Sequence, residues 1–155
     1  MVAPKASREQ WILRGRTISK RYNLFGQGDR WSGQTAHIQI EFKPSRITRI
    51  LEPDFQIVLK PNPLSDWEDG HLDAYTFFAD EPDESPLAML VEIHTAADRS
   101  LNISCSLAKD AEAVVDRLCF GRDMVFIVHD GEERLFELPI PNDHSVYDFI
   151  RKAML

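Results

Sequence analysis

Cysteine, long apolar runs and a leader-like N-terminus are scarce or missing in this sequence, and each shortage excludes a class of protein. The two cysteines, Cys105 and Cys119, provide no disulfide framework and are typical of small buried hydrophobic residues in a reducing compartment. No apolar run approaches the ~20 residues that cross a bilayer, and residues 1–10 lack the apolar core of a signal peptide. We therefore expect a cytoplasmic protein that does not associate with a membrane.

The sequence also lacks the motifs that bind nucleotides and metal ions. The stretch from Gly28 to Thr35 nearly matches the phosphate-loop pattern, but Gln34 replaces the lysine that reaches the phosphates, and a strand pattern follows where a helix should begin. The five histidines never fall at His-x-His or His-x-x-x-His spacing, so they indicate no metal pair. We expect no cofactor and no metal ion.

One acidic stretch could be taken for a metal loop. It places five potential ligands in eight positions: Asp66, Glu68, Asp69, His71 and Asp73. The calcium-loop pattern fails, because His71 stands where the sixth-position glycine is required and Phe77 where the twelfth-position glutamate is required. A solvated loop is the simpler interpretation, and a looser Ca²⁺ or Zn²⁺ site is the alternative.

A catalytic pairing can be written for His94 as a base with Ser104 or Ser106 as a nucleophile. There is no G-x-S-x-G elbow, however, and a serine that faces water on a strand is the ordinary case. Cys105 falls among apolar residues and is a core residue rather than a nucleophile. We therefore assign no catalytic residue and expect a protein that is not an enzyme.

The composition indicates one globular domain that spans residues 1–155. Of these residues 43% are hydrophobic and 28% are charged, a balance that supports a packed core and excludes a disordered or fibrous chain. The clearest local pattern runs from Leu87 to Leu107, where apolar residues occupy every second position of two segments, 87–93 and 101–107. This alternation predicts an antiparallel hairpin with one face toward a core and one toward water.

The rest of the chain contains further strand patterns and two helix patterns. Strands are predicted at 11–19, with Gly15 as a bulge, and at 35–43, 45–51, 55–59, 71–79, 124–128 and 134–138. Residues 124–128 are apolar throughout, which favours a central strand covered on both faces. Residues 20–33 are predicted to form a long loop. An Asp-Gly pair near 130 indicates a hairpin whose loop length stays open between two, three and four residues.

Helices are predicted near 110–120 and 146–154, where apolar residues recur at helical spacing. Ser145 with Asp148 fits a capping box, and Phe149 and Ile150 lie on the apolar face of the second helix. Together these elements predict an α+β fold that is mostly β: an antiparallel sheet of about eight or nine strands, arranged as a sandwich or a half-open barrel, with two helices.

Charge is distributed unevenly along the chain. The net charge is -7, yet residues 1–60 carry 11 Lys and Arg against 5 Asp and Glu, while residues 61–155 carry 7 against 20. If the fold keeps these halves apart, the surface is dipolar and steers oppositely charged partners to different sides. If the halves interleave, the charges neutralise each other.

Cations and flat side chains gather near the N-terminus. We predict a partner-binding surface formed by Arg14, Arg16, Lys20, Arg21, Tyr22, Arg30 and Trp31, with Trp11 close by in sequence. The leading hypothesis is a small non-enzymatic binding or adaptor protein that acts through protein contacts. One alternative is a module for single-stranded nucleic acid or another polyanion, which requires a basic groove with stacking platforms. A second alternative is a β-rich ligand carrier or enzyme whose pocket is assembled from residues distant in sequence.

Overall fold

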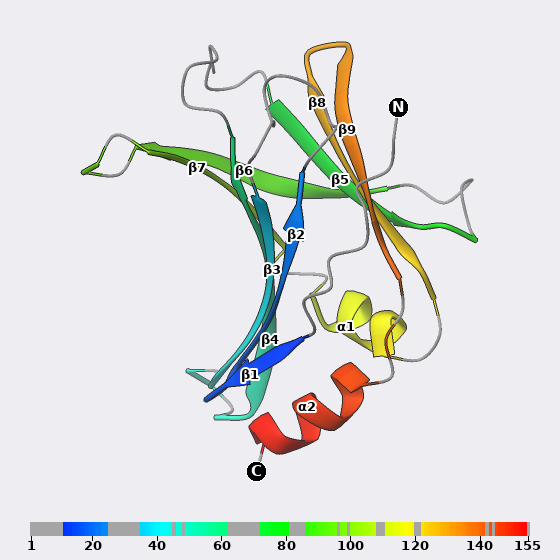
Figure 1. Ribbon diagram of the computed structural model, residues 1–155. Helices are drawn as coiled ribbons and strands as arrows, with labels where there is room; N and C mark the ends of the chain where they lie inside the picture. The colour runs from blue at the N-terminus through cyan, green and yellow to red at the C-terminus, as the bar shows by residue number, and fades with distance from the viewer. Residues whose placement is uncertain are drawn as a thin grey trace.

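Strands dominate the structure, a computed structural model that describes residues 11–24, 35–44, 46–47, 49–61, 72–80, 86–95, 97–98, 100–107, 111–119, 122–141, 143 and 145–154 (Figure 1). Within these residues the strands are β1 (Ile12–Arg14), β2 (Thr17–Asn23), β3 (Thr35–Pro44), β4 (Leu51–Lys60), β5 (Leu72–Phe78), β6 (Leu87–Thr95), β7 (Leu101–Leu107), β8 (Met124–Asp130) and β9 (Glu133–Ile140). The helices are α1 (Ala111–Cys119) and α2 (Ser145–Met154).

The nine strands form one open antiparallel sheet in the order β1-β2-β3-β4-β7-β6-β5-β8-β9. This confirms the predicted α+β, mostly β fold. The hairpin of β6 and β7 lies in the middle of the sheet, and its register places Val91 opposite Cys105, as the alternation predicts. Strand β6 joins two parts of the sheet, since residues up to Met89 pair with β5 and residues from Leu90 onward pair with β7.

Alternation along the strands gives the sheet two unlike faces. The core face carries buried side chains from every second position, including Ile18, Ile38, Ile40, Phe42, Phe55, Ile57, Leu59, Ile103 and Cys105. The outer face carries the intervening polar residues. On this face Gln56 Nε2 donates a hydrogen bond to Ser104 Oγ at 2.5 Å, which links β4 to β7.

Both helices lie on the side of the core face, with α1 between the β2–β3–β4 part of the sheet and the β8–β9 hairpin, and α2 at one end of the molecule (Figure 1). Helix α1 packs on β4 and buries Val114 and Leu118 completely. Helix α2 contacts α1 and β2 and buries Val146, whereas Phe149 is only half-buried against the core. No helix in the described ranges is long and apolar enough to cross a membrane.

The cap of α2 differs from the predicted capping box. Asp143, and not Ser145, caps the helix: its Oδ1 accepts hydrogen bonds from the backbone N of Ser145 at 2.9 Å and from Ser145 Oγ at 2.7 Å. The backbone N of Val146 also donates to the Asp143 carbonyl at 3.1 Å. Asp143 is as good a cap as serine by residue type, and it lies where the chain turns into the helix.

The predicted strand 11–19 is wrong in its interior, because Gly15 is a turn residue and not a bulge. Gly15 has φ of +60°, a left-handed conformation that glycine adopts at little cost, and the chain reverses there between β1 and β2. Strand β2 then continues to Asn23, into the region predicted as a loop. Residues 25–33 of that predicted loop lie outside the described residues.

The predicted strands 45–51 and 55–59 are also corrected. One strand, β4, runs from Leu51 to Lys60 and passes through Pro53, which pairs with Phe42 of β3. Strand β7 pairs with β4 only from Phe55 to Leu59, so Pro53 lies where β4 has a neighbour on one side only, and strands tolerate proline at such edges. Arg46 and Ile47 form part of the turn before β4.

Strand β8 is not central, contrary to the prediction from its apolar sequence. It lies next to the edge of the sheet, between β5 and β9, although Phe126, Ile127 and Val128 are all buried. The β8–β9 connection is the shortest of the predicted choices, with Gly131 and Glu132 between the paired Asp130 and Glu133. Gly131 has φ of +61°, as the first position of a II′ hairpin turn requires.

Candidate basic groove

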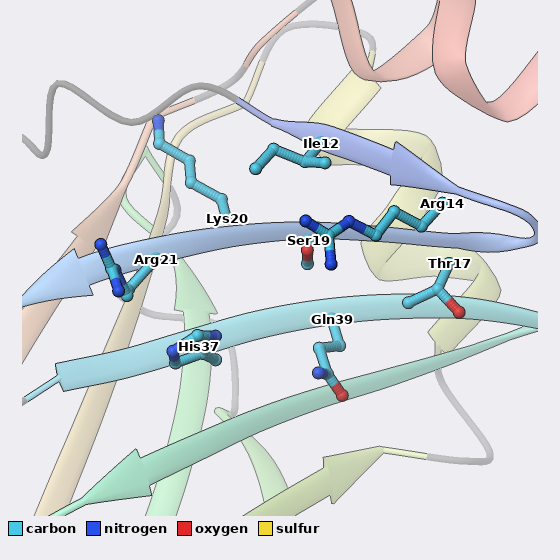
Figure 2. A pocket seen from close by; sticks show the side chains of 8 residues that line it. All are labelled: Ile12, Arg14, Thr17, Ser19, Lys20, Arg21, His37 and Gln39. Atoms are coloured by element: carbon cyan, nitrogen blue, oxygen red, sulfur yellow. The ribbon is translucent and has the colours of Figure 1, made fainter.

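A groove of about 720 Å³ lies on the outer face of the sheet, over β1, β2 and β3 (Figure 2). Its lining is polar and basic with one large aliphatic side chain. The lining residues are Ile12, Arg14, Thr17, Ser19, Lys20, Arg21, His37 and Gln39. We call this surface the basic groove.

The register of the first three strands builds the groove. Thr17, Ser19 and Arg21 alternate along β2 with buried Ile18 and Tyr22, so they share the outer face. Across the strands, Ser19 lies opposite Ile12 on β1 and opposite Gln39 on β3, and Arg21 lies opposite His37. The turn at Gly15 brings Arg14 back opposite Thr17. Residues separated by more than twenty positions therefore meet on one surface.

The lining is positively charged. Arg14, Lys20 and Arg21 are permanent cations at neutral pH. No carboxylate is present among the described residues that line the groove. Two carboxylates farther along β3 and β4 lie close to a cation: Lys43 Nζ lies 3.8 Å from Glu41 Oε2 and 3.4 Å from Asp54 Oδ2. The groove therefore presents an attractive surface to an anionic group.

The structure brings together three of the residues predicted to bind a partner. Arg14 and Arg21 have exposed side chains in the groove, and Lys20 is half-buried at its margin. Arg16 is exposed in the turn beside Gly15 and does not line the groove, while its carbonyl accepts a hydrogen bond from the Phe42 backbone N at 2.9 Å. Arg30 and Trp31 lie outside the described residues.

Tyr22 and Trp11 belong to the core rather than to the groove. Each side chain is only 4% exposed. Lys20 connects the two regions, since its Nζ lies 5.1 Å from the centroid of the Tyr22 ring and both residues line a smaller cavity of about 280 Å³ between β2 and the β8–β9 hairpin. Burial, with the negative charge of Asp143, raises the pKa of Tyr22 from 10.0 to about 12.

Five lining residues were not identified as site residues from the sequence: Ile12, Thr17, Ser19, His37 and Gln39. The alternation of residues 35–43 did predict His37 and Gln39 on the polar side of a strand. They lie near Arg14 and Arg21 because of the strand pairing and the turn at Gly15. The sequence pattern of residues 11–19 predicts one continuous strand and so does not indicate that turn.

The other catalytic candidates of the sequence, His94 and Ser104, lie on the paired strands β6 and β7, where Ser104 is opposite Glu92 and His94 is opposite Asn102. His94 Nε2 lies 3.2 Å from Glu92 Oε2, both side chains being exposed, whereas Ser104 is bonded to Gln56. Within the described part of the chain, no three His, Cys, Asp or Glu side chains gather as metal ligands. Most of the acidic cluster 66–73 lies outside that part.

Comparisons with protein-family models, with curated proteins and with solved structures find no match for this chain.

Proposed function

We propose that the protein is a non-enzymatic adaptor that binds an acidic segment of a partner protein in the basic groove. One observation carries the proposal: Arg14, Lys20 and Arg21 line one groove whose described lining contains no carboxylate. Guanidinium groups form paired, charge-assisted hydrogen bonds with carboxylates, so two arginines suit side chains of Asp and Glu.

The uncharged lining residues also suit a peptide. Thr17, Ser19 and Gln39 provide donors and acceptors for the polar groups of a peptide backbone. Ile12 is 47% exposed and offers an apolar contact at the margin. Polar groups around an exposed apolar side chain are a common composition at protein interfaces.

Nucleic acid is the second candidate partner, and the burial of Trp11 and Tyr22, the aromatic residues of the predicted surface that the structure describes, disfavours it. Single-stranded nucleic acid is bound by stacking its bases on exposed rings, but Trp11 and Tyr22 are both 4% exposed. The net charge of -7 also repels a polyanion as a whole, while a short acidic segment contacts only the groove.

We place this function in the cytoplasm, without a membrane-associated state, as part of the same proposal. Cys105 and Cys119 support it, because both are free thiols buried in the core, as is usual in a reducing compartment.

The test compares charge reversal inside the groove with charge reversal outside it. Binding of a short fluorescein-labelled glutamate-rich peptide is measured by anisotropy for wild type, for Arg14→Glu with Arg21→Glu, and for the matched control Arg16→Glu with Arg46→Glu. The control changes the charge equally at exposed residues that do not line the groove. We expect affinity to fall at least about tenfold in the first variant and to change less than about twofold in the control.

A labelled single-stranded oligonucleotide provides the competing outcome. We expect it to bind weakly or not at all. Tight oligonucleotide binding whose affinity falls with salt at roughly -0.7 per phosphate contact, in a log-log plot, would instead support the nucleic-acid function. Equal losses of peptide binding in the two charge-reversal variants would refute the groove as the site.

A further inference from the structure

A second groove, of about 410 Å³, lies on the core-face side of the molecule where the start of β4 meets α1 and α2. We call it the helix-side groove. Its wall is apolar: Phe42 and Val115 are buried there, and Ile50 and Tyr147 are 64% and 40% exposed. Ile47, in the turn before β4, adds a side chain that is 93% exposed. Exposed apolar side chains therefore occur both in the groove and in the turn that precedes it in the sequence.

Three carboxylates line the same groove. Glu112 and Asp116 lie four residues apart on α1 and so share one face of the helix, and Glu52 comes from β4. All three side chains are exposed. Among the described residues that line the groove there is no lysine or arginine. Arg49 and Arg151 are next in sequence to the lining residues Ile50 and Ile150 but do not line the groove themselves. Like charges at this helical spacing repel each other, and a bound cation relieves that repulsion.

We propose that the helix-side groove is a second binding site, which takes a segment of a partner protein that carries lysine or arginine beside large apolar side chains. Charge complementarity selects this occupant: the apolar wall accepts Leu, Ile or Phe side chains, and the three carboxylates pair with the cations that flank them. The site is independent of the basic groove, because it has opposite charge and different residues. An adaptor with both grooves links an acidic partner to a basic one.

The test uses a short fluorescein-labelled peptide in which Leu and Phe alternate with Lys, and a control peptide in which Glu replaces Lys. The peptides are titrated into wild type, into Glu112→Gln with Asp116→Asn, and into the matched control Glu132→Gln with Glu133→Gln. The control removes the same charge from exposed residues of the β8–β9 hairpin. Thermal melting of each variant establishes that it folds.

We expect the lysine peptide to bind wild type. Its affinity should fall at least about tenfold in the variant with Glu112→Gln and Asp116→Asn, and should change less than about twofold in the control variant. A second variant, Ile50→Ser, tests the apolar wall without changing charge and is expected to weaken binding severalfold. Binding is expected to persist in Arg14→Glu with Arg21→Glu, so failure at one groove is distinguishable from failure at the other.

Three results would overturn the inference. The first is no binding of the lysine peptide. The second is an equal loss in the two carboxylate variants, which would indicate diffuse attraction to an acidic protein. The third is a concentration-dependent mass in sedimentation that disappears with Glu112→Gln and Asp116→Asn, which would show that a second copy of this chain occupies the groove.

Discussion

The basic groove and the helix-side groove use opposite faces of the same strand and differ in charge and polarity. Strand β3 contributes His37 and Gln39 to the first and Phe42 to the second. The basic groove is lined by residues at the outward-facing, polar positions of the strands. The helix-side groove lies between apolar residues of β3, β4 and the two helices, where their packing leaves a space. In this fold, the face of the sheet sets the chemistry of the site: the outer-face groove is polar and basic, and the helix-side groove combines an apolar wall with three carboxylates.

The largest expected effect comes from a substitution on the core face. Phe55 is completely buried on β4, so Phe55→Ala should lower the free energy of unfolding by about 3–5 kcal/mol. Phe149→Ala, the comparison variant on α2, should cost roughly 1–2 kcal/mol because the side chain is half-buried. Urea denaturation measures both values. Equal losses would show that α2 is as deeply packed as the sheet.

Alkaline pH should lower the stability of the protein through two groups that are buried on the core face. Burial raises the pKa of Cys105 from 9.0 to about 12, and that of Tyr22 from 10.0 to about 12. The folded state therefore retains protons that the unfolded state loses, so stability is kept below pH ~9 and falls as the pH rises toward 12. Each group contributes a fall of about 1.4 kcal/mol per pH unit above its unfolded pKa.

Tyr22→Phe tests this origin of the pH effect. The Tyr22 hydroxyl is buried without a hydrogen-bond partner among the described residues, so its removal should cost little stability at pH 7. The free energy of unfolding, measured from pH 8 to 11, should then fall less steeply above pH 10 in this variant than in wild type. An unchanged decline would mean that Tyr22 titrates in the folded protein as it does in water.

The smallest effect is expected on the outer face. Gln56→Ala removes the hydrogen bond from Gln56 Nε2 to Ser104 Oγ, a partly buried contact between strands. The loss should be about 0.5–1.5 kcal/mol. A double-mutant cycle with Ser104→Ala isolates the bond, and its coupling energy should account for most of the single-variant loss. A coupling energy near zero would show that outer-face polar pairs contribute nothing to sheet pairing.

Much of the fold follows from local patterns. The alternation of Leu87 to Leu107 predicts β6 and β7 and the core-facing set of each, and the helical spacing near 110–120 predicts α1. These predictions hold because, in an element with one apolar face, the residues that recur at regular spacing in the sequence are the ones that face the core. Boundaries at Gly15 and Pro53 could not be read in this way, since each residue permits both a break and a continuation of the strand.

The candidate sites were less accessible from the sequence. Arg14, Lys20 and Arg21 were predicted from local charge, and the structure places them in one groove. The helix-side groove was not predicted, because Glu52, Glu112 and Tyr147 meet only through tertiary packing of β4, α1 and α2. Side chains that gather from distant segments give no local signal, however strong the charge or apolar pattern of each segment.

The central claim is that an acidic partner segment binds on the outer face over β1, β2 and β3, and chemical-shift mapping tests it most directly. The glutamate-rich peptide is titrated into ¹⁵N-labelled protein and the amide shifts are followed. The largest shift changes are expected at the amides of Arg14, Ser19, Arg21, His37 and Gln39, and the amides of α1 and α2 are expected to stay unchanged. Changes centred on the helices, or spread evenly over the molecule, would contradict it.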